Sequence, residues 1–549
     1  MSVSRCGTWK VLLVAGWSCW CLGLLCGCDS GREAQPTKPG PTAARIVAGG
    51  SYQVPLLNNP STLDPLYVQD DYGATIVSQV FSGLIRFSPE LYVVPDLAAT
   101  WSVDSGGTVY RFTLRPATFH DGRPVTATDV VFSLSRLFRA DPEPFILPQL
   151  LKVEGAEAYR RGSADTVAGF EAADDKTFIV RLSEPYAPFL TALGMYQAKI
   201  VPRDLLLQDP RLFSRRPVGS GPFRFVRWDR DQAIHLAKFA DYFAAPAKLD
   251  QVVFRIYPGG KADAVLADFL ADRLDEMPVS GSVREELTGL PDLQWLHRPN
   301  LSILFYGFNC RHPLLKDVRV RTLLAAAIDR QALVQQVYGG QFEPAASILP
   351  PGMPGYQPQP AGFAAAVADR AAFQELTGLA SGQSLALEIV SAVESAQSRA
   401  ELEFIKQAWA PLGVRVDPKF IPDWGRFETY LAAPTLQVYR YVWFADIPDP
   451  DNVLGPLFGS RAAANFMRYE DPEVDTGLRQ ALKLTDAVPR AEMYRRLEQR
   501  ILTAAPLAPL FYLTSDRVYK PLVRGVQLGA LGFAYSTLAE VYWVHPEDQ

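Results

Sequence analysis

The sequence predicts a mixed α/β fold, because short β-type runs alternate with stretches of helical periodicity. The β-type runs are rich in β-branched and aromatic residues and lie at 109–114, 178–182, 233–236 and 252–256. Between them, apolar residues recur at the spacing of a helix face. With 549 residues, of which 48% are hydrophobic, the chain is long enough for about two to four domain-sized units.

Two helical stretches are the clearest. Residues 317–338 predict one long helix, since their apolar residues fill a broad face and Asp317 is a suitable N-cap. Residues 399–411 predict a second helix. Leu412 and Gly413 then lead into a β-type run, a helix-to-strand turn that is typical of α/β units.

The N-terminus has the pattern of an export signal. Arg5 and Lys10 precede an apolar stretch at 11–26, so residues 1–27 are expected to be a signal peptide. The apolar stretch is somewhat shorter than the ~20 residues of a membrane-spanning helix, which leaves an uncleaved anchor as the alternative. Residues 28–45 are rich in proline and small residues and are expected to form a flexible tether.

Leu25-Cys26-Gly27-Cys28 resembles the lipobox of bacterial lipoproteins, in which the last cysteine receives a diacylglycerol. Cys28 is therefore the expected lipidation site, although Cys26 stands where this pattern usually has Ala, Ser or Thr. Ordinary cleavage that leaves Cys28 free is the alternative. With Cys28 lipidated, only Cys310 remains in the exported part, so no disulfide is expected.

Composition and motifs exclude several classes of function. The net charge is −5 and the chain has no run of five or more basic residues, which argues against a nucleic-acid partner. No compact catalytic or phosphate-binding motif is present, and the five histidines lack the spacing of metal ligands. We therefore expect no enzyme activity, no cofactor and no metal. Gly219-Ser220-Gly221-Pro222 is interpreted as a structural turn, because its proline removes an amide donor.

Short motifs follow one another over almost the whole exported chain. They are Ser61-Thr62-Leu63-Asp64-Pro65, Val80-Phe81-Ser82-Gly83-Leu84, Pro95-Asp96-Leu97-Ala98, Phe119-His120-Asp121-Gly122, Val218-Gly219-Ser220-Gly221-Pro222-Phe223, Asp317-Val318-Arg319, Trp443-Phe444-Ala445-Asp446, Asp449-Pro450-Asp451-Asn452 and Ala505-Pro506-Leu507-Ala508-Pro509. In this order they resemble the peptide- and nickel-binding family of ABC-transporter solute-binding proteins. Some of them have structural roles. We assign Asp64, Gly122 and Asp317 to a loop, a turn and a helix cap.

The resemblance implies a bilobal periplasmic-binding-protein-like α/β fold with two hinge strands and an extra insertion domain. Lobe I would comprise 46–91, 210–298 and 513–549, lobe II would comprise 299–512, and the insertion domain would comprise 92–209. The hinges would lie near 299–309 and 506–514. The protein would be a monomer that is lipid-anchored at the extracytoplasmic face of the inner membrane and delivers a small solute to permease subunits of an ABC importer.

One aromatic strand carries the predicted ligand site. Residues 438–446 have high β-propensity, and alternation places Arg440, Val442, Phe444 and Asp446 on one side. In peptide-binding relatives the aspartate at the position of Asp446 pairs with the ligand's α-ammonium. The strand before it pairs with the ligand's backbone, so Val442, Trp443, Phe444 and Ala445 are candidate ligand-binding residues.

Two further residues have open alternatives. Trp424 matches an aromatic that lines side-chain pockets in relatives, but a core tryptophan on a helix face is equally compatible with the sequence. Arg440 matches a cation near the ligand's carboxylate, or it is a buried cation paired with another carboxylate. If it faces the ligand, its separation of ~20 Å from Asp446 along the strand suits about three to five ligand residues.

Four functions remain in competition. The first is capture of peptides. The residues at 391–398 argue against a dipeptide specialist, because they lack the Arg that dipeptide-binding relatives carry there, and they also lack the His of some oligopeptide-binding relatives. The second is the same fold binding a nickel chelate, haem or a sugar. The third is an exported hydrolase that uses Asp446 with Asp449, and the fourth is a chemosensory or adhesive surface lipoprotein.

Overall fold

The computed structural model describes residues 45–104, 106–214, 216–358, 369–380 and 382–548. The predicted signal peptide, Cys28 and all but the last residue of the tether lie outside this part of the chain. Within the described residues, no helix is both long and apolar enough to cross a membrane. The same residues contain no group of three or more His, Cys, Asp or Glu side chains that is arranged to hold a metal ion.

The first large sheet joins the start of the described chain to its middle. Its order is β2-β11-β10-β9, with β2 parallel to β11 and the other pairs antiparallel. The strands are β2 (Ser51–Leu56), β9 (Phe223–Asp229), β10 (Ala233–Lys238) and β11 (Gln251–Ile256). Helix α1 (Asp71–Val80) packs with this sheet in one hydrophobic cluster. A small sheet of β1 (Ile46–Val47), β22 (Tyr542–Val544) and β21 (Val523–Arg524) lies beside the C-terminus.

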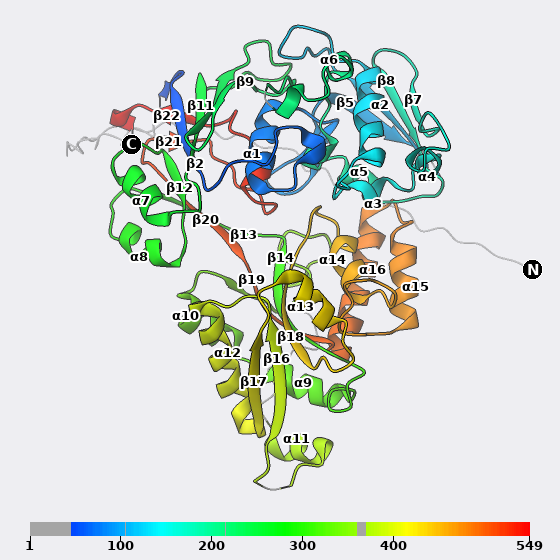
Figure 1. Cartoon of the computed structure of the whole chain (residues 1–549), viewed down its shortest axis with the longest axis vertical. Coiled ribbons are helices and arrows are strands. Elements are labelled where there is room, and N and C mark those ends of the chain that lie inside the picture. The colour runs from blue at the N-terminus through cyan, green and yellow to red at the C-terminus, as the bar shows by residue number, and fades with distance from the viewer. Residues whose placement is uncertain (1–44, 105, 215, 359–368, 381, 549) are drawn as a thin grey trace, which may run out of the picture. The chain divides into compact units, whose positions relative to one another are not determined.

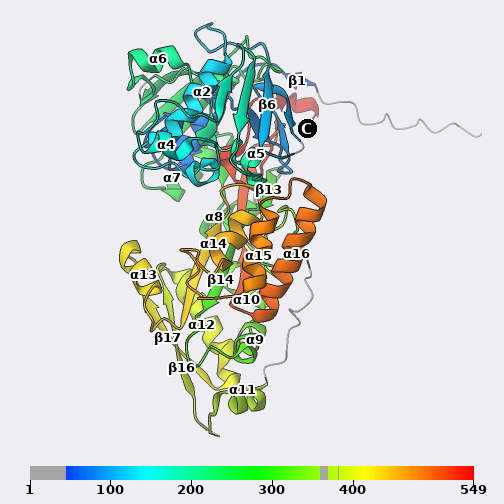
Figure 2. The ribbon, with the colours of Figure 1, turned by 90° about the vertical axis from the view of Figure 1, so that its right-hand side faces the viewer.

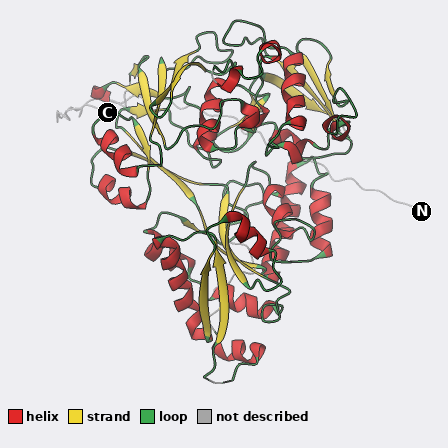
Figure 3. Cartoon of the chain, viewed as in Figure 1, coloured by secondary structure: helices red, strands yellow, loops and turns green. Residues whose placement is uncertain are grey.

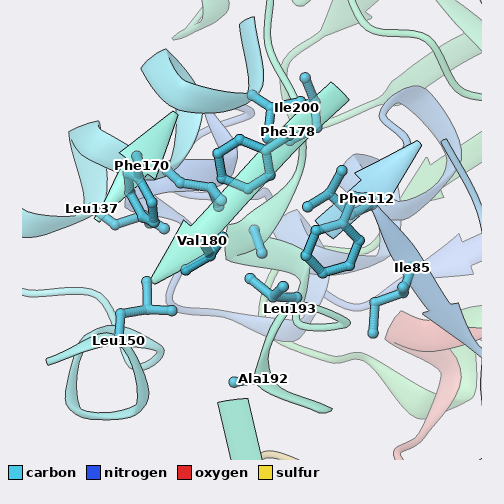
Figure 4. Close-up of a cluster of buried hydrophobic side chains, with 14 of the residues drawn as sticks. Ile85, Phe112, Leu137, Leu150, Phe170, Phe178, Val180, Ala192, Leu193 and Ile200 are labelled. Atoms are coloured by element: carbon cyan, nitrogen blue, oxygen red, sulfur yellow. The ribbon is translucent and has the colours of Figure 1, made fainter. Parts of the chain in front are cut away.

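The next sheet lies entirely within residues 92–209 and has the order β5-β6-β8-β7. Its strands are β5 (Ala98–Val103), β6 (Val109–Leu114), β7 (Phe170–Ala172) and β8 (Thr177–Arg181), and a hairpin of β3 (Ile85–Phe87) and β4 (Val93–Pro95) precedes it. The helices here are α2 (Ala127–Arg136), α3 (Leu147–Leu150), α4 (Ala156–Arg160), α5 (Pro188–Ala192) and α6 (Arg203–Gln208). Figure 4 shows the core that this sheet shares with α2, α3, α4 and α5, in which Phe112 and Phe178 lie close to Val180 and Leu193.

The largest sheet has the order β15-β19-β14-β18-β16-β17. Its strands are β14 (Ser302–Phe308), β15 (Glu343–Pro344), β16 (Leu385–Ser391), β17 (Val414–Phe420), β18 (Val438–Phe444) and β19 (Leu507–Tyr512). One hydrophobic cluster joins it to α9 (Val318–Ala326), α10 (Arg330–Tyr338), α11 (Arg370–Thr377) and α12 (Ala396–Trp409) (Figure 1). A second cluster joins it to α13 (Trp424–Leu431), α14 (Asp451–Phe458), α15 (Pro472–Ala481) and α16 (Ala487–Ala504). Helices α15 and α16 pack side by side (Figure 2).

Two chain segments connect this sheet to a three-stranded sheet of order β12-β20-β13 (Figure 3). The smaller sheet contains β12 (Glu276–Pro278), β13 (Gln294–Pro299) and β20 (Thr514–Tyr519), and it packs near α7 (Ala262–Leu270) and α8 (Gly281–Thr288). The connections are Asn300 with Leu301 and, in the second segment, Leu513 alone. They are bonded to each other, since Asn300 N–H donates to the Leu513 carbonyl at 2.8 Å. Both lie inside the ranges predicted for the hinges.

The predicted β-type runs at 109–114, 178–182, 233–236 and 252–256 coincide with β6, β8, β10 and β11, so these predictions are confirmed. The prediction of a single helix over 317–338 is wrong, because α9 ends at Ala326 and α10 begins at Arg330. Asp329 causes the break, since its extended backbone and its side-chain bond to the Ala332 N–H make it the N-cap of a new helix. The expected Asp317 cap is confirmed.

The glycine motif at 219–222 is a structural turn, as expected. A Cβ on Gly219 would lie 2.0 Å from the Val80 carbonyl oxygen, and one on Gly221 would lie 2.5 Å from the Gln79 oxygen. Only glycine therefore allows this turn to lie against the end of α1. The motif holds α1 in place, and α1 contributes a wall of the candidate site.

Candidate functional site

A cavity of about 450 Å³ lies where β18 ends. Segments far apart in the sequence form its walls: α1, the loops around Phe145 and Tyr196, the connection at Asn300, the end of β18, and residues 530–535. Two large aromatic side chains on these walls are unusually open to solvent, Phe145 at 46% and Phe444 at 55%. Exposed aromatic residues gathered on one recess are typical of a ligand site.

Asp446 lies at the mouth of this recess, two residues beyond the end of β18. Its backbone N–H donates to Asn452 Oδ1 at 2.7 Å, and the Asn452 carbonyl accepts from Trp443 Nε1 at 2.8 Å. Ala445 N–H donates to the Leu301 carbonyl at 2.8 Å. These bonds fix the backbone on either side of the Asp446 carboxylate. Loss of hydration in the recess raises the pKa of Asp446, and hydrogen bonding from Asn452 opposes that rise.

One edge of β18 is open beside the cavity. Strand β14 pairs with β18 from Val438 to Phe444, whereas β16 pairs with it only at Val438 and Tyr439. Because Ala445 N–H points toward β14, alternation turns the N–H and C=O groups of Val442 and Phe444 to the other side. No described strand pairs with those two residues there. This edge can accept an extended backbone as an added strand.

The opposite wall carries a second carboxylate. Asp71 is the first residue of α1, whose N-cap Asp70 accepts from Gly73 N–H at 2.7 Å. Loss of hydration, and then the negative charge of Asp70, raise the pKa of Asp71. Gln79 ties α1 to the C-terminal part of the cavity, because its side chain donates to the Ser536 carbonyl at 2.8 Å and accepts from Leu538 N–H at 3.0 Å.

Two tyrosines on the walls of the cavity have hydroxyl groups whose pKa values both carboxylates raise. The rings of Tyr196 and Tyr535 have centroids 5.8 Å apart. Burial raises the pKa of each hydroxyl, and the charges of Asp446 and Asp71 raise both further. Both tyrosines therefore lie within electrostatic range of both acids. Among the described residues that line the cavity there is no Lys, Arg or His, so the recess has a negative potential.

Of the predicted ligand-binding residues, Phe444, Ala445 and Asp446 line the cavity, whereas the others do not. Val442 contributes the open edge of β18, and Trp443 donates its indole N–H to Asn452. Trp424 is the first residue of α13, is 52% exposed and has its ring 6.0 Å from that of Tyr441. The alternative of a core tryptophan is therefore wrong.

Arg440 occupies the second of its two predicted positions, as a buried cation paired with a carboxylate. Its Nε and Nη2 donate to the two carboxylate oxygens of Glu401 at 2.9 and 3.0 Å, and Glu401 is fully buried. Burial would lower the pKa of Arg440, but the charge and hydrogen bonds of Glu401 raise it above its usual range. The ligand length of three to five residues assumed that Arg440 faces the ligand, so this geometry removes its basis.

Asp449 does not share the recess with Asp446. It is buried, and Arg490 binds both of its oxygens at 2.7 and 2.8 Å. A hydrolase that uses this pair of acids would need both carboxylates at one substrate bond. The interpretation of Asp446 and Asp449 as a catalytic pair is therefore wrong.

Sequence reasoning missed Asp71, Tyr196 and Tyr535. The adjacent acids Asp70 and Asp71 at a helix start were the only signal near them, and such pairs usually serve as caps. All three residues lie far from Asp446 in the sequence, so no local pattern links them to it. Only the fold brings residues 71, 196, 446 and 535 to one cavity.

Comparison with known proteins identifies the family. The family described as "Bacterial extracellular solute-binding proteins, family 5 Middle" matches residues 92–465. The chain belongs to this family. It is 26% identical to heme-binding protein A of Haemophilus influenzae and 28% identical to the peptide transport periplasmic protein SapA of Salmonella typhimurium, in each case over 93% of this chain and 95% of the relative.

The fold is also shared with solved structures. The murein tripeptide binding protein MppA, in its unliganded open form, superposes with a TM-score of 0.81 at 23% identity, covering 92% of this chain and all of that one. The chain therefore has the bilobal α/β fold of periplasmic binding proteins, as predicted. Family membership confirms that it is a solute-binding protein.

Proposed function

We propose that this protein captures peptides by their N-terminal end and delivers them to the permease of an ABC importer. The observation that carries this proposal is the open edge of β18 leading to Asp446. A peptide removed from water needs partners for its amides and a carboxylate for its ammonium. Val442 and Phe444 offer the first through their backbone, and Asp446 offers the second.

The geometry fits a peptide bound in extended form along β18. Its backbone would pair with β18 on the side away from β14, so affinity would not depend on the identity of its side chains. Phe145, Phe444 and Trp424 are exposed aromatic surfaces on which ligand side chains can pack. Several relatives carry names of peptide binders, including SapA and MppA, which supports this choice of ligand.

Haem is the second candidate, because heme-binding protein A is among the relatives. Haem carries two propionates, and buried carboxylates require cationic partners. The described lining residues include two carboxylates and no Lys, Arg or His. The charge of the cavity therefore favours an ammonium over a propionate. A nickel chelate or a sugar has no specific feature in its favour.

The proposal extends to location and to the lack of catalysis. The protein would act at the extracytoplasmic face of the inner membrane, anchored as a monomer through a lipid on Cys28, and would not alter its ligand. The sequence Leu25-Cys26-Gly27-Cys28 supports the anchor. Mass spectrometry of the mature N-terminus tests it, and an unmodified N-terminus at another residue would exclude it.

A ligand screen tests the main proposal. Peptides of several lengths with free N-termini, haem, nickel and sugars would each be added to the purified protein in a thermal-shift assay. A peptide present at 100 times its dissociation constant should add ~2.7 kcal/mol to the free energy of unfolding. Stabilisation by haem, nickel or a sugar with none by any peptide would overturn the proposal.

A further inference from the structure

Asp71 and Asp446 are solvent-accessible carboxylates that line the cavity. Several buried acids of the chain are instead paired with arginine: Asp64 with Arg136, Glu276 with Arg517, Glu401 with Arg440, Asp449 with Arg490, and Asp516 with Arg284. Neither Asp71 nor Asp446 forms an ion pair with any residue that the structure describes. Because both carboxylates line the cavity and have no protein cation, each can accept a charged hydrogen bond from a cationic group of the ligand.

The two acids belong to a single site. Both line the same cavity of about 450 Å³, from opposite walls. The negative charges of Asp71 and Asp446 both raise the pKa of Tyr196 and of Tyr535, so the two carboxylates act on the same part of the cavity. A single ammonium at Asp446 would leave the charge of Asp71 uncompensated.

The walls around the carboxylates suit an organic cation. The aromatic faces of Phe145, Phe444, Phe533, Tyr196 and Tyr535 line the cavity. Such faces attract ammonium and guanidinium groups and pack against the methylene stems that carry them. Asn300 and Ser515 add polar atoms at the connection between the sheets, and Ser515 Oγ donates to Asn300 Oδ1 at 2.7 Å.

We propose that this site selects ligands whose buried end carries two positive charges, and in particular peptides whose first residue is Lys or Arg. The inference rests on the proposed function. The α-ammonium binds Asp446, and the side-chain cation of the first residue binds Asp71. Asp71 is therefore a specificity-determining residue, whereas Asp446 serves every peptide with a free N-terminus.

Calorimetry with two matched peptides tests this inference. One peptide begins with lysine, and the other begins with norleucine, which has the same number of carbon atoms in its side chain but no charge. The wild-type protein should bind the lysine peptide about tenfold more tightly, as expected for one added charge pair in a partly enclosed site. Asp71→Asn should abolish that ratio and leave the affinity for the norleucine peptide within about twofold of wild type.

Two variants complete the design. Asp263→Asn is the matched control, because Asp263 is an exposed acid in the first turn of α7, as Asp71 is in α1, and lies outside the cavity. It should keep the tenfold ratio. Asp446→Asn should weaken both peptides and also keep their ratio. Thermal melting of each variant confirms that it is folded.

The outcomes separate the two claims. Equal affinity of wild type for the two peptides, or a lysine preference that survives Asp71→Asn in a folded variant, would overturn the role of Asp71 and leave peptide capture intact. Failure of both peptides to bind the wild type would overturn peptide capture and the inference together.

Discussion

Arg440 shows how the fold decides between two roles that the sequence leaves open. Its strand position places it on the same side as Phe444, and both a ligand contact and a structural ion pair agree with that placement. The structure adds Glu401 from α12, together with Tyr306, whose hydroxyl donates to Glu401 Oε1 at 2.6 Å. A complete set of partners satisfies the buried carboxylate.

Replacement of Arg440 by methionine tests that structural role. Arg440→Met leaves Glu401 buried without a counter-charge, so the free energy of unfolding should fall by ~3–5 kcal/mol. Chemical denaturation measures this decrease in the free energy of unfolding. The control is Arg415→Met on β17, which removes an exposed pair with Asp417 and should cost at most about 1 kcal/mol. If Arg440→Met keeps its stability but loses affinity for peptides, Arg440 contacts the ligand instead.

Residue-level prediction named cavity residues where the signal lies in the local sequence. Asp446 was found because it ends an apolar strand within a recognisable motif, and Phe444 and Ala445 followed from it. Asp71 and Tyr196 were not found, because nothing in their own segments distinguishes a cavity wall from a helix cap or a loop. Their role arises from contacts across several hundred residues.

At the scale of elements, the start of α14 controls the position of Asp446. Asn452, the second residue of α14, accepts the Asp446 N–H, and Asp451 precedes it. Burial raises the pKa of Asp451 to about 7; the charge of Asp449 adds to the rise, and Arg490 opposes it. The helix thus begins with a carboxyl group that takes up a proton more readily in the folded chain than in the unfolded one.

Protonation of Asp451 makes the free energy of unfolding depend on pH. Because the pKa of Asp451 is higher in the folded state, its contribution is fully present below the unfolded value of 3.8 and is lost as pH rises through about 7. Asp451→Asn removes that contribution. The melting temperature of the variant minus that of wild type should therefore increase from pH 4 to pH 8. A difference that stays constant over this range would show that Asp451 is not the responsible group.

Element prediction was most reliable for strands with strong β-propensity, such as β6 and β11. It failed at the break between α9 and α10, because the apolar periodicity continues through Asp329 and hides a new cap. The open edge of β18 was not predictable from β18 alone. It exists because β16 pairs with only two residues of β18, a property of a neighbouring strand.

At the scale of the whole molecule, the order of motifs along the chain predicted the family and its bilobal fold, and both are confirmed. The proposed limits of the lobes and of the insertion domain remain predictions. The cavity itself is a product of the fold, because its walls come from α1, β18, the connection at Asn300 and the C-terminal loop. Such an assembly has no signature in any single segment.

The direct test of peptide capture combines a protein variant with a ligand modification. A peptide with a free N-terminus and its N-acetylated form would be titrated by calorimetry into wild type, Asp446→Asn and the control Asp263→Asn. The Asp446 variant and the acetyl group should each lower affinity by ~3–5 kcal/mol, or roughly two to four decades. Their effects should not add, because both remove the same ion pair. The account would be contradicted if Asp446→Asn bound each peptide with the affinity of wild type but had a lower melting temperature. Asp446 would then be a structural acid of the turn before α14, and a solute other than a peptide would be the ligand.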